Sequence, residues 1–149
     1  MNLIDVNVLI ALADPSHTHR SQAKAWFRDA AREGWATCPI TENAFIRILG
    51  QPAYPNGPQC PTGALQILKH LTSLPGHQFW NDTLSLTDEE RFRIHSKTTS
   101  KQITDLYLLA MAVARGGRLI TFDRRIDADS VVNGVRSITN LETYLARSN

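Results

Sequence analysis

Four carboxylates from distant parts of the chain are predicted to meet at one edge of a β-sheet. Asp5 and Asp123 each follow a short apolar segment that predicts a buried strand. Glu42 and Asp105 instead lie in the first turns of predicted helices. In a parallel α/β sheet, strand ends and helix starts share one edge, and ligand sites form there. We therefore expect these four acids to converge at that edge.

Position alone does not separate a functional acid from a structural one. Acids are favoured in a helix's first turn, where they complement the positive dipole end, and acids after strands often occupy turns. The local setting is more informative, because Asp5, Asp105 and Asp123 are each embedded among apolar residues. Desolvated carboxylates are costly, and several together repel one another unless a cation binds. Oxygen donors without His or Cys at ligand spacing favour Mg²⁺ or Mn²⁺.

The elements that must position these acids are short apolar strands alternating with segments of helical period. Strands are predicted at 2–5, 35–39, 77–80, 118–122 and 135–138, and apolar helix stripes at 23–30, 65–71 and 106–113. This alternation predicts an α/β fold with a central parallel five-stranded sheet flanked by helices in three α/β/α layers. Residues 51–63 hold four prolines and two glycines, which predicts a surface loop inside a single domain of 1–149.

The composition is that of an ordinary globular protein. With 42% hydrophobic and 20% charged residues among 149, the chain is neither disordered nor fibrous. No apolar run reaches the ~20 residues of a membrane span. The net charge of +2 permits a nucleic-acid partner without requiring one. Cys38 and Cys60 fit no metal pattern, and the N-terminus carries no secretion signal, so we expect reduced thiols and a cytoplasmic location.

In chain order, four segments resemble the motifs of the PIN domain family, most closely the VapC-type toxins of bacterial toxin–antitoxin pairs. They are residues 3–10 (LIDVNVLI), 39–43 (PITEN), 104–112 (TDLYLLAMA) and 119–123 (LITFD). They span almost the whole chain, and the acids occur in the family's order. The resemblance implies a PIN-like domain that is a metal-dependent endoribonuclease, hydrolysing RNA phosphodiester bonds with Mg²⁺ or Mn²⁺ as cofactor.

The resemblance also implies roles for individual residues. The catalytic positions are Asp5, Glu42, Asp105 and Asp123, of which Asp5, Asp105 and Asp123 hold the metal ion. Asn7 and Thr121 match polar residues that support these acids. Asp127 lies one helical turn beyond Asp123, and it is an alternative that shares or replaces the role of Asp123, although a turn residue is the simpler interpretation of it.

Basic residues and partners extend this hypothesis. Arg124 and Lys101 are candidate RNA contacts, since a strand approaching an acidic pocket needs positive flanks. A further row of basic residues predicts a cationic stripe opposite the apolar face of one helix: Arg20, Lys24, Arg28 and Arg32. The resemblance implies a cognate antitoxin protein, which inserts a basic side chain into the acidic pocket, and a homodimer.

Two alternatives come from other functional classes. A non-catalytic PIN-like binding module would keep the fold and use its surface for a partner, although the retention of all four acids disfavours it. A haloacid-dehalogenase-like phosphatase would use the acid after the first strand as a nucleophile. Such enzymes carry Asp-x-Asp at this place, whereas here the second position is Asn7, and no downstream lysine is convincingly placed.

Overall fold

Five parallel strands form the central sheet of this computed structural model, which describes residues 1–144. They are β1 (Asn2–Ile4), β2 (Trp35–Thr37), β3 (His77–Phe79), β4 (Arg118–Thr121) and β5 (Ile138–Asn140). Their spatial order is β3-β2-β1-β4-β5, so the first strand of the chain is the central one. All neighbouring pairs are parallel, as predicted. The last residues of the predicted domain, 145–149, lie outside the described part of the chain.

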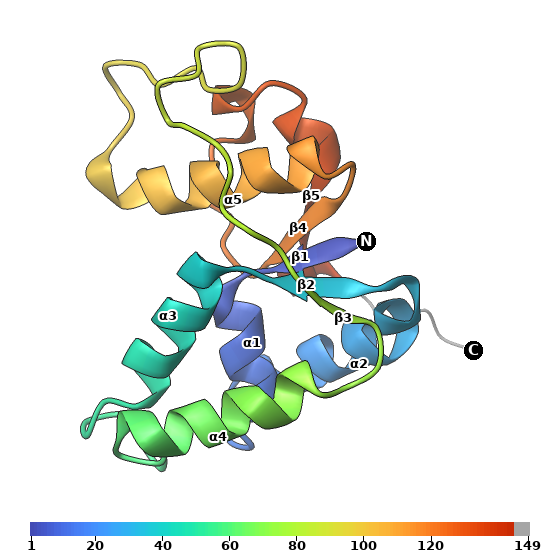
Figure 1. The fold of residues 1–149 in the computed structure, drawn as a ribbon, viewed down its shortest axis with the longest axis vertical. Coiled ribbons are helices and arrows are strands. Elements are labelled where there is room, and N and C mark those ends of the chain that lie inside the picture. The colour runs from blue at the N-terminus through green and yellow to red at the C-terminus, as the bar shows by residue number, and fades with distance from the viewer. Residues whose placement is uncertain (145–149) are drawn as a thin grey trace.

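Helices cover both faces of the sheet. They are α1 (Val6–Ala13), α2 (Arg20–Ala30), α3 (Pro39–Leu49), α4 (Pro61–Thr72) and α5 (Ile103–Ala114). Figure 1 shows α5 on one side of the strands and α1, α2, α3 and α4 on the other. The predicted α/β/α arrangement in three layers is therefore confirmed.

The alternation of side chains along β1 divides the hydrophobic core in two. Ile4 packs into the core beneath α1 to α4, whereas its neighbour Leu3 faces the α5 side. On that side, residues 106–112 of α5 are all buried, and Phe92 and Val131 from outside the sheet belong to the same core cluster. This explains why α5 is apolar all round. Within residues 1–144, no helix has the length and apolarity of a membrane span.

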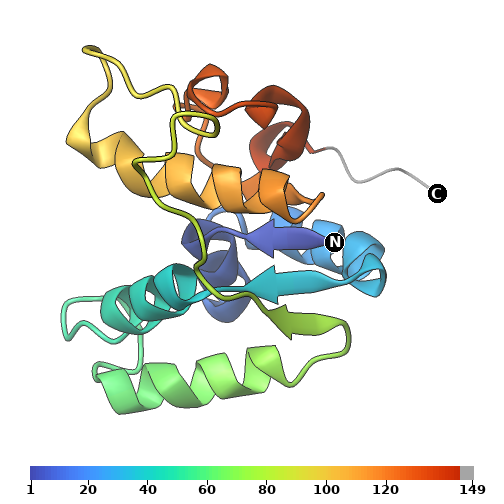
Figure 2. The same cartoon turned by 45° about the horizontal axis from the view of Figure 1, so that its top comes forward.

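The strands and helices share one functional edge, as parallel topology requires. Figure 2 shows the arrows of β1, β2 and β3 pointing to the same side of the molecule, where α3 and α5 begin. Asp5 directly follows β1 and caps the N-terminus of α1, since its side chain accepts a hydrogen bond from the Val6 backbone N–H. The predicted placement of Glu42 and Asp105 in first helical turns is also confirmed.

The structure corrects the predicted fifth strand. β5 is Ile138–Asn140 rather than 135–138, because Gly134–Ser137 form a 3₁₀ turn. Asn133 precedes this turn with a left-handed φ of 64°, which redirects the chain. Val135, predicted to lie in a buried strand, is 60% exposed.

Other details of the helices also differ from the prediction. The Pro-rich loop ends at Cys60, because Pro61 occupies the first turn of α4, where its fixed φ and missing N–H are tolerated. Leu65 in this helix is exposed, and Ala64, Leu68 and Leu71 form the buried stripe instead. In addition, the apolar residues after Asp5 form α1, a helix that was not among the predicted ones.

Candidate active site

Asp5 is the most buried acid of the site. The residue is 4% exposed, and its carboxylate accepts hydrogen bonds at both oxygens. Oδ1 accepts from the Val6 backbone N–H at 2.7 Å, and Oδ2 accepts from Thr121 Oγ1 at 2.7 Å and from Asn7 Nδ2 at 3.2 Å. The structure therefore places Asn7 and Thr121 beside Asp5, where the resemblance put them. These bonds stabilise the ionised form of a buried carboxylate.

The same two polar residues connect the ends of β1 and β4. Asn7 Nδ2 also donates to Thr121 Oγ1 at 3.2 Å, and Asn7 Oδ1 accepts from the Phe122 backbone N–H at 3.2 Å. Thr121 Oγ1 in turn accepts from the Asp123 backbone N–H at 3.0 Å. The positions of Asp5 and Asp123 are thus fixed by one hydrogen-bond network.

Three aspartates of the site repel one another. Burial, followed by the charges of Asp5 and Asp123, raises the pKa of Asp105 to about 6, with Arg125 opposing the shift. Burial also raises the pKa of Asp5, and the charge of Asp123 adds to that rise, although the bonds from Thr121, Val6 and Asn7 oppose it. The acids that follow β1 and β4 therefore share one poorly solvated region with the acid in the first turn of α5. Such a grouping is typical of a functional site.

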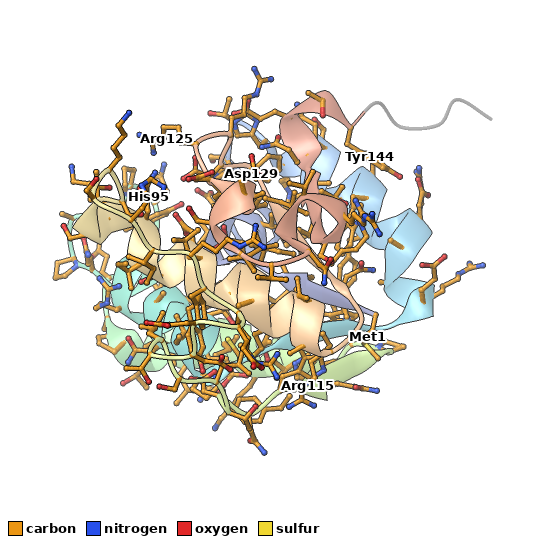
Figure 3. The ribbon with its side chains drawn as sticks, turned by 90° about the horizontal axis from the view of Figure 1, so that it is seen from above. Met1, His95, Arg115, Arg125, Asp129 and Tyr144 are labelled. Carbon is orange, nitrogen blue, oxygen red and sulfur yellow. The ribbon has the colours of Figure 1, made fainter. Side chains whose placement is uncertain are left out.

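Asp123, rather than Asp127, belongs to this cluster. Its Oδ1 accepts from the backbone N–H of Arg125 at 2.8 Å and from Arg125 Nε at 3.3 Å. The carboxylate of Asp127 instead accepts from Ser130 Oγ at 2.7 Å, which is the main reason that its pKa is lowered, and lies 3.4 Å from His95 Nε2. Figure 3 shows His95 and Arg125 on the same side of the molecule.

Glu42 makes a different set of contacts. Its Oε1 accepts from Thr37 Oγ1 at 2.6 Å, and the same hydroxyl lies 2.8 Å from His77 Nε2. The carboxylate is thereby tied to β2 and β3, and its catalytic role stays a prediction. Sequence reasoning did not single out Thr37 or His77. The available signal was a hydroxyl at the end of a strand, five residues before the acid.

The aspartates fit a hard divalent cation by their chemistry. In residues 1–144, no three or more His, Cys, Asp and Glu side chains form a ready-made metal cage. Mg²⁺ does not need one, since it commonly uses one or two carboxylates and retains several waters. Asp5, Asp105 and Asp123 supply only oxygen donors, and a cation would relieve their mutual repulsion.

A pocket of about 390 Å³ lies beside Asp123. It is lined by Asn7, Phe122, Asp123, Arg124, Arg125 and Glu142. The structure thus brings Arg124 to the site, where its guanidinium contacts the Glu142 carboxylate. Lys101 is exposed in the 3₁₀ turn that precedes α5. Of the two predicted RNA contacts, only Arg124 is thus placed in the pocket beside Asp123, and the role of Lys101 stays a prediction.

Comparison with known proteins identifies the family. The sequence pattern described as "PIN domain" matches residues 3–129, which include all four predicted catalytic acids. The chain belongs to the PIN domain family. The matched range runs from β1 to the turn after β4, and the four predicted catalytic acids of this PIN domain lie within it.

Relatives of this PIN domain are named as ribonucleases. Ribonuclease VapC44 of Mycobacterium tuberculosis (strain H37Rv) is 44% identical over 132 residues, covering 87% of this chain and 90% of that protein. Ribonuclease VapC39 of the same strain is 40% identical over 133 residues, covering 89% and 95%.

A solved structure supports the same fold. VapBC2 from Rickettsia felis, crystallised with a DNA fragment from its promoter, aligns with a TM-score of 0.56 over 93% of this chain and 97% of that chain. Their sequence identity is 11%, so the likeness concerns the fold of the PIN domain alone.

Proposed function

We propose that this protein is a Mg²⁺- or Mn²⁺-dependent endoribonuclease of the VapC type, the toxin of a type II toxin–antitoxin pair. The observation that carries the proposal is the group of mutually repelling aspartates, Asp5, Asp105 and Asp123, on one sheet edge. Relatives at 40% and 44% identity named as ribonucleases support RNA as the substrate. Membership of the PIN family leaves the phosphatase alternative without support.

In this proposal, the aspartates of the site bind a cation and the basic residues bind RNA. Asp5, Asp105 and Asp123 would hold the ion, which when bound supplies Lewis acidity and lowers the pKa of a water near the scissile phosphate. The bonds from Asn7 and Thr121 fix the orientation of the Asp5 carboxylate, so that it would bind an ion without reorganisation. Glu42 is the fourth catalytic acid of the proposal.

Basic side chains hold the RNA backbone in this proposal. Arg124 lies in the pocket beside Asp123, and Lys101 precedes the helix that carries Asp105. Their charges offset the repulsion between phosphates and the acidic site, and they contribute affinity without base specificity.

The test is cleavage of mixed cellular RNA by the purified protein, with Mg²⁺, with Mn²⁺ and with EDTA, beside an Asp5→Asn variant. The proposal predicts cutting that requires the metal and disappears in the variant, and sequencing of the cut ends then identifies the target. Metal binding without cutting would point to a narrow substrate. No cutting and no Mn²⁺ binding would favour the non-catalytic binding module.

A protein antitoxin is the proposed partner, and one surface fits it. A groove of about 750 Å³ runs between α1, α2 and α4, and we call it the α2–α4 groove. Its apolar lining includes Leu12, Phe27, Ile67, Leu71 and Leu74, and its basic lining consists of Arg20, Lys24, Arg28 and His70. An amphipathic segment with acidic residues beside its apolar face matches this chemistry. Three residues of the predicted cationic stripe thus border an apolar surface rather than bulk solvent alone.

A homodimer and a cytoplasmic location complete the proposal. Both rest on the resemblance to VapC-type toxins, and an enzyme that cuts cellular RNA meets its substrate in the cytoplasm. Light scattering of the purified protein tests the dimer, and fractionation of cells tests the location.

A further inference from the structure

A chain of hydrogen bonds joins Glu42 to a residue on the edge strand of the sheet. Thr37 Oγ1 donates to Glu42 Oε1 at 2.6 Å and lies 2.8 Å from His77 Nε2. We propose that His77 is a positioning residue, which acts through Thr37 to hold the Glu42 carboxylate in a single orientation. This inference rests on the proposed function, in which Glu42 is a catalytic acid.

The direction of each bond follows from the donors available. An ionised carboxylate only accepts, so the single proton of the Thr37 hydroxyl goes to Glu42. The Thr37 oxygen must then accept from His77, which assigns a proton to His77 Nε2. Protonation of the second ring nitrogen would leave this donor in place. The chain of bonds therefore does not depend on the titration of His77.

Burial of Thr37 and packing of the His77 ring hold these hydrogen bonds in one arrangement. Thr37 is fully buried, so no bulk water competes for its hydroxyl. The His77 ring packs against Trp35, with ring centroids 4.6 Å apart, and Trp35 Nε1 donates to the Pro75 carbonyl at 3.2 Å. His77 is therefore a fixed donor rather than a mobile one.

The consequence for Glu42 is a loss of side-chain freedom before substrate binds. A free Glu side chain samples many rotamers, and a carboxylate that is already fixed does not lose this freedom again at the transition state. The bond from Thr37 is charge-assisted and short, as strong bonds of this type are. Hydrogen-bond partners that orient metal ligands typically contribute roughly 10- to 100-fold to activity, and we expect an effect of this size from the positioning of Glu42.

The first test observes the bonds themselves and needs no activity. Nitrogen-15 NMR of the His77 ring should find the proton on Nε2, exchanging slowly with solvent. Thr37→Val removes the acceptor and should abolish this protection, whereas Gln78→Ala, an exposed neighbour on β3, should retain it. A proton on Nδ1 of neutral His77, or unchanged protection in Thr37→Val, would overturn the proposal.

The second test is a kinetic double-mutant cycle on an RNA that the wild-type protein cuts. Thr37→Val and His77→Ala should each lower kcat by roughly 10- to 100-fold with little change in KM. Thr37→Ser and His77→Gln keep an oxygen and a nitrogen donor at these places and should recover most of the rate. In the Glu42→Gln background, Thr37→Val should add little further loss.

The possible negative results of these tests lead to different conclusions. A full, multiplicative loss from Thr37→Val in the Glu42→Gln background would show that Thr37 acts by another route and would overturn the inference. Unchanged kcat in Glu42→Gln would overturn it as well, since there would be no catalytic carboxylate to position. If the wild-type protein cut no RNA and bound no Mn²⁺, the proposed function would fail, and the NMR result would still decide whether His77 holds Glu42 through Thr37.

Discussion

Thr121 Oγ1 donates to Asp5 Oδ2 at 2.7 Å, although 116 residues separate the two in sequence. The same hydroxyl oxygen accepts from the backbone N–H of Asp123. One buried side chain at the end of β4 therefore orients the acid after β1 and the backbone of the acid after β4. The geometry of the acidic site depends on this pairing of neighbouring strands.

Replacement of Thr121 by Val should weaken both stability and activity. The change keeps the shape but removes the donor to a buried carboxylate, which costs about 1–3 kcal/mol of unfolding free energy. The pKa of Asp5 should rise further, since the bond from Thr121 opposes its elevation by burial. Urea unfolding and cleavage assays measure the two effects. Thr121→Ser is the matched control, and equal losses in Ser and Val would contradict this explanation.

The stability of the metal-free protein should fall as the pH rises through about 6. The pKa of Asp105 is about 6 in the folded protein and 3.8 without its surroundings, so the native state binds this proton more tightly. Its stabilising contribution is therefore complete below about pH 4 and is lost as the pH rises through the folded pKa. Asp105→Asn should be more stable than wild type at neutral pH by about 1 kcal/mol, after allowance for solvent screening.

Urea unfolding in EDTA at acidic and neutral pH measures this difference. Addition of Mn²⁺ should reverse the loss in the wild type, because binding to the native state stabilises it. An identical pH profile for the variant and the wild type would contradict a pKa of Asp105 that is raised by burial and by the neighbouring aspartates.

Asp123 and Asp127 should differ in their importance for cleavage. Asp123→Asn removes a charge that acts on both Asp5 and Asp105 and should abolish metal-dependent cutting. Asp127→Asn loses contacts with Ser130 and His95 outside that cluster and should retain most of the activity. Parallel cleavage assays compare the two variants. Loss confined to Asp127→Asn would transfer the role to that residue.

A charged residue in the α2–α4 groove should weaken antitoxin binding. Ile67 lines the groove, and Ile67→Glu would place a carboxylate among its apolar side chains and repel an acidic partner. We expect a loss of at least about tenfold in affinity, measured by calorimetry with the cognate antitoxin. Leu65→Glu is the control, because Leu65 is exposed on the same helix outside the groove lining. Equal affinity of both variants would place the partner elsewhere.

The grouping of Asp5, Asp105 and Asp123 was predictable from sequence because topology, rather than side-chain detail, brings them together, whereas the expected convergence of Glu42 with them stays a prediction. Asp5 and Asp123 follow short apolar strands, and Asp105 opens a helix that is apolar on every face. Parallel pairing of β1 with β4 then places these positions at one edge. The family prediction, made from the ordered motifs, is confirmed by the match over residues 3–129.

The bonds around Glu42 could not be predicted in the same way. They depend on the register of β2 against β3, in which Trp35 pairs with His77. A three-residue edge strand carries too little pattern to fix that register from sequence. The shift of β5 could not be predicted either, because it depends on the backbone conformation of a few residues. Asn133 adopts a left-handed conformation, and a 3₁₀ turn follows it.

The most direct measurement is the single-turnover cleavage rate of one mapped RNA as a function of Mn²⁺ concentration, for wild type and for Asp5→Asn. A metal site built on Asp5 predicts a saturable dependence on Mn²⁺ in the wild type that EDTA abolishes. It predicts at least a roughly 100-fold lower rate in the folded variant, with saturation at higher Mn²⁺ where a rate is measurable. Wild-type rates in Asp5→Asn, or cutting that persists in EDTA, would contradict a metal site built on Asp5.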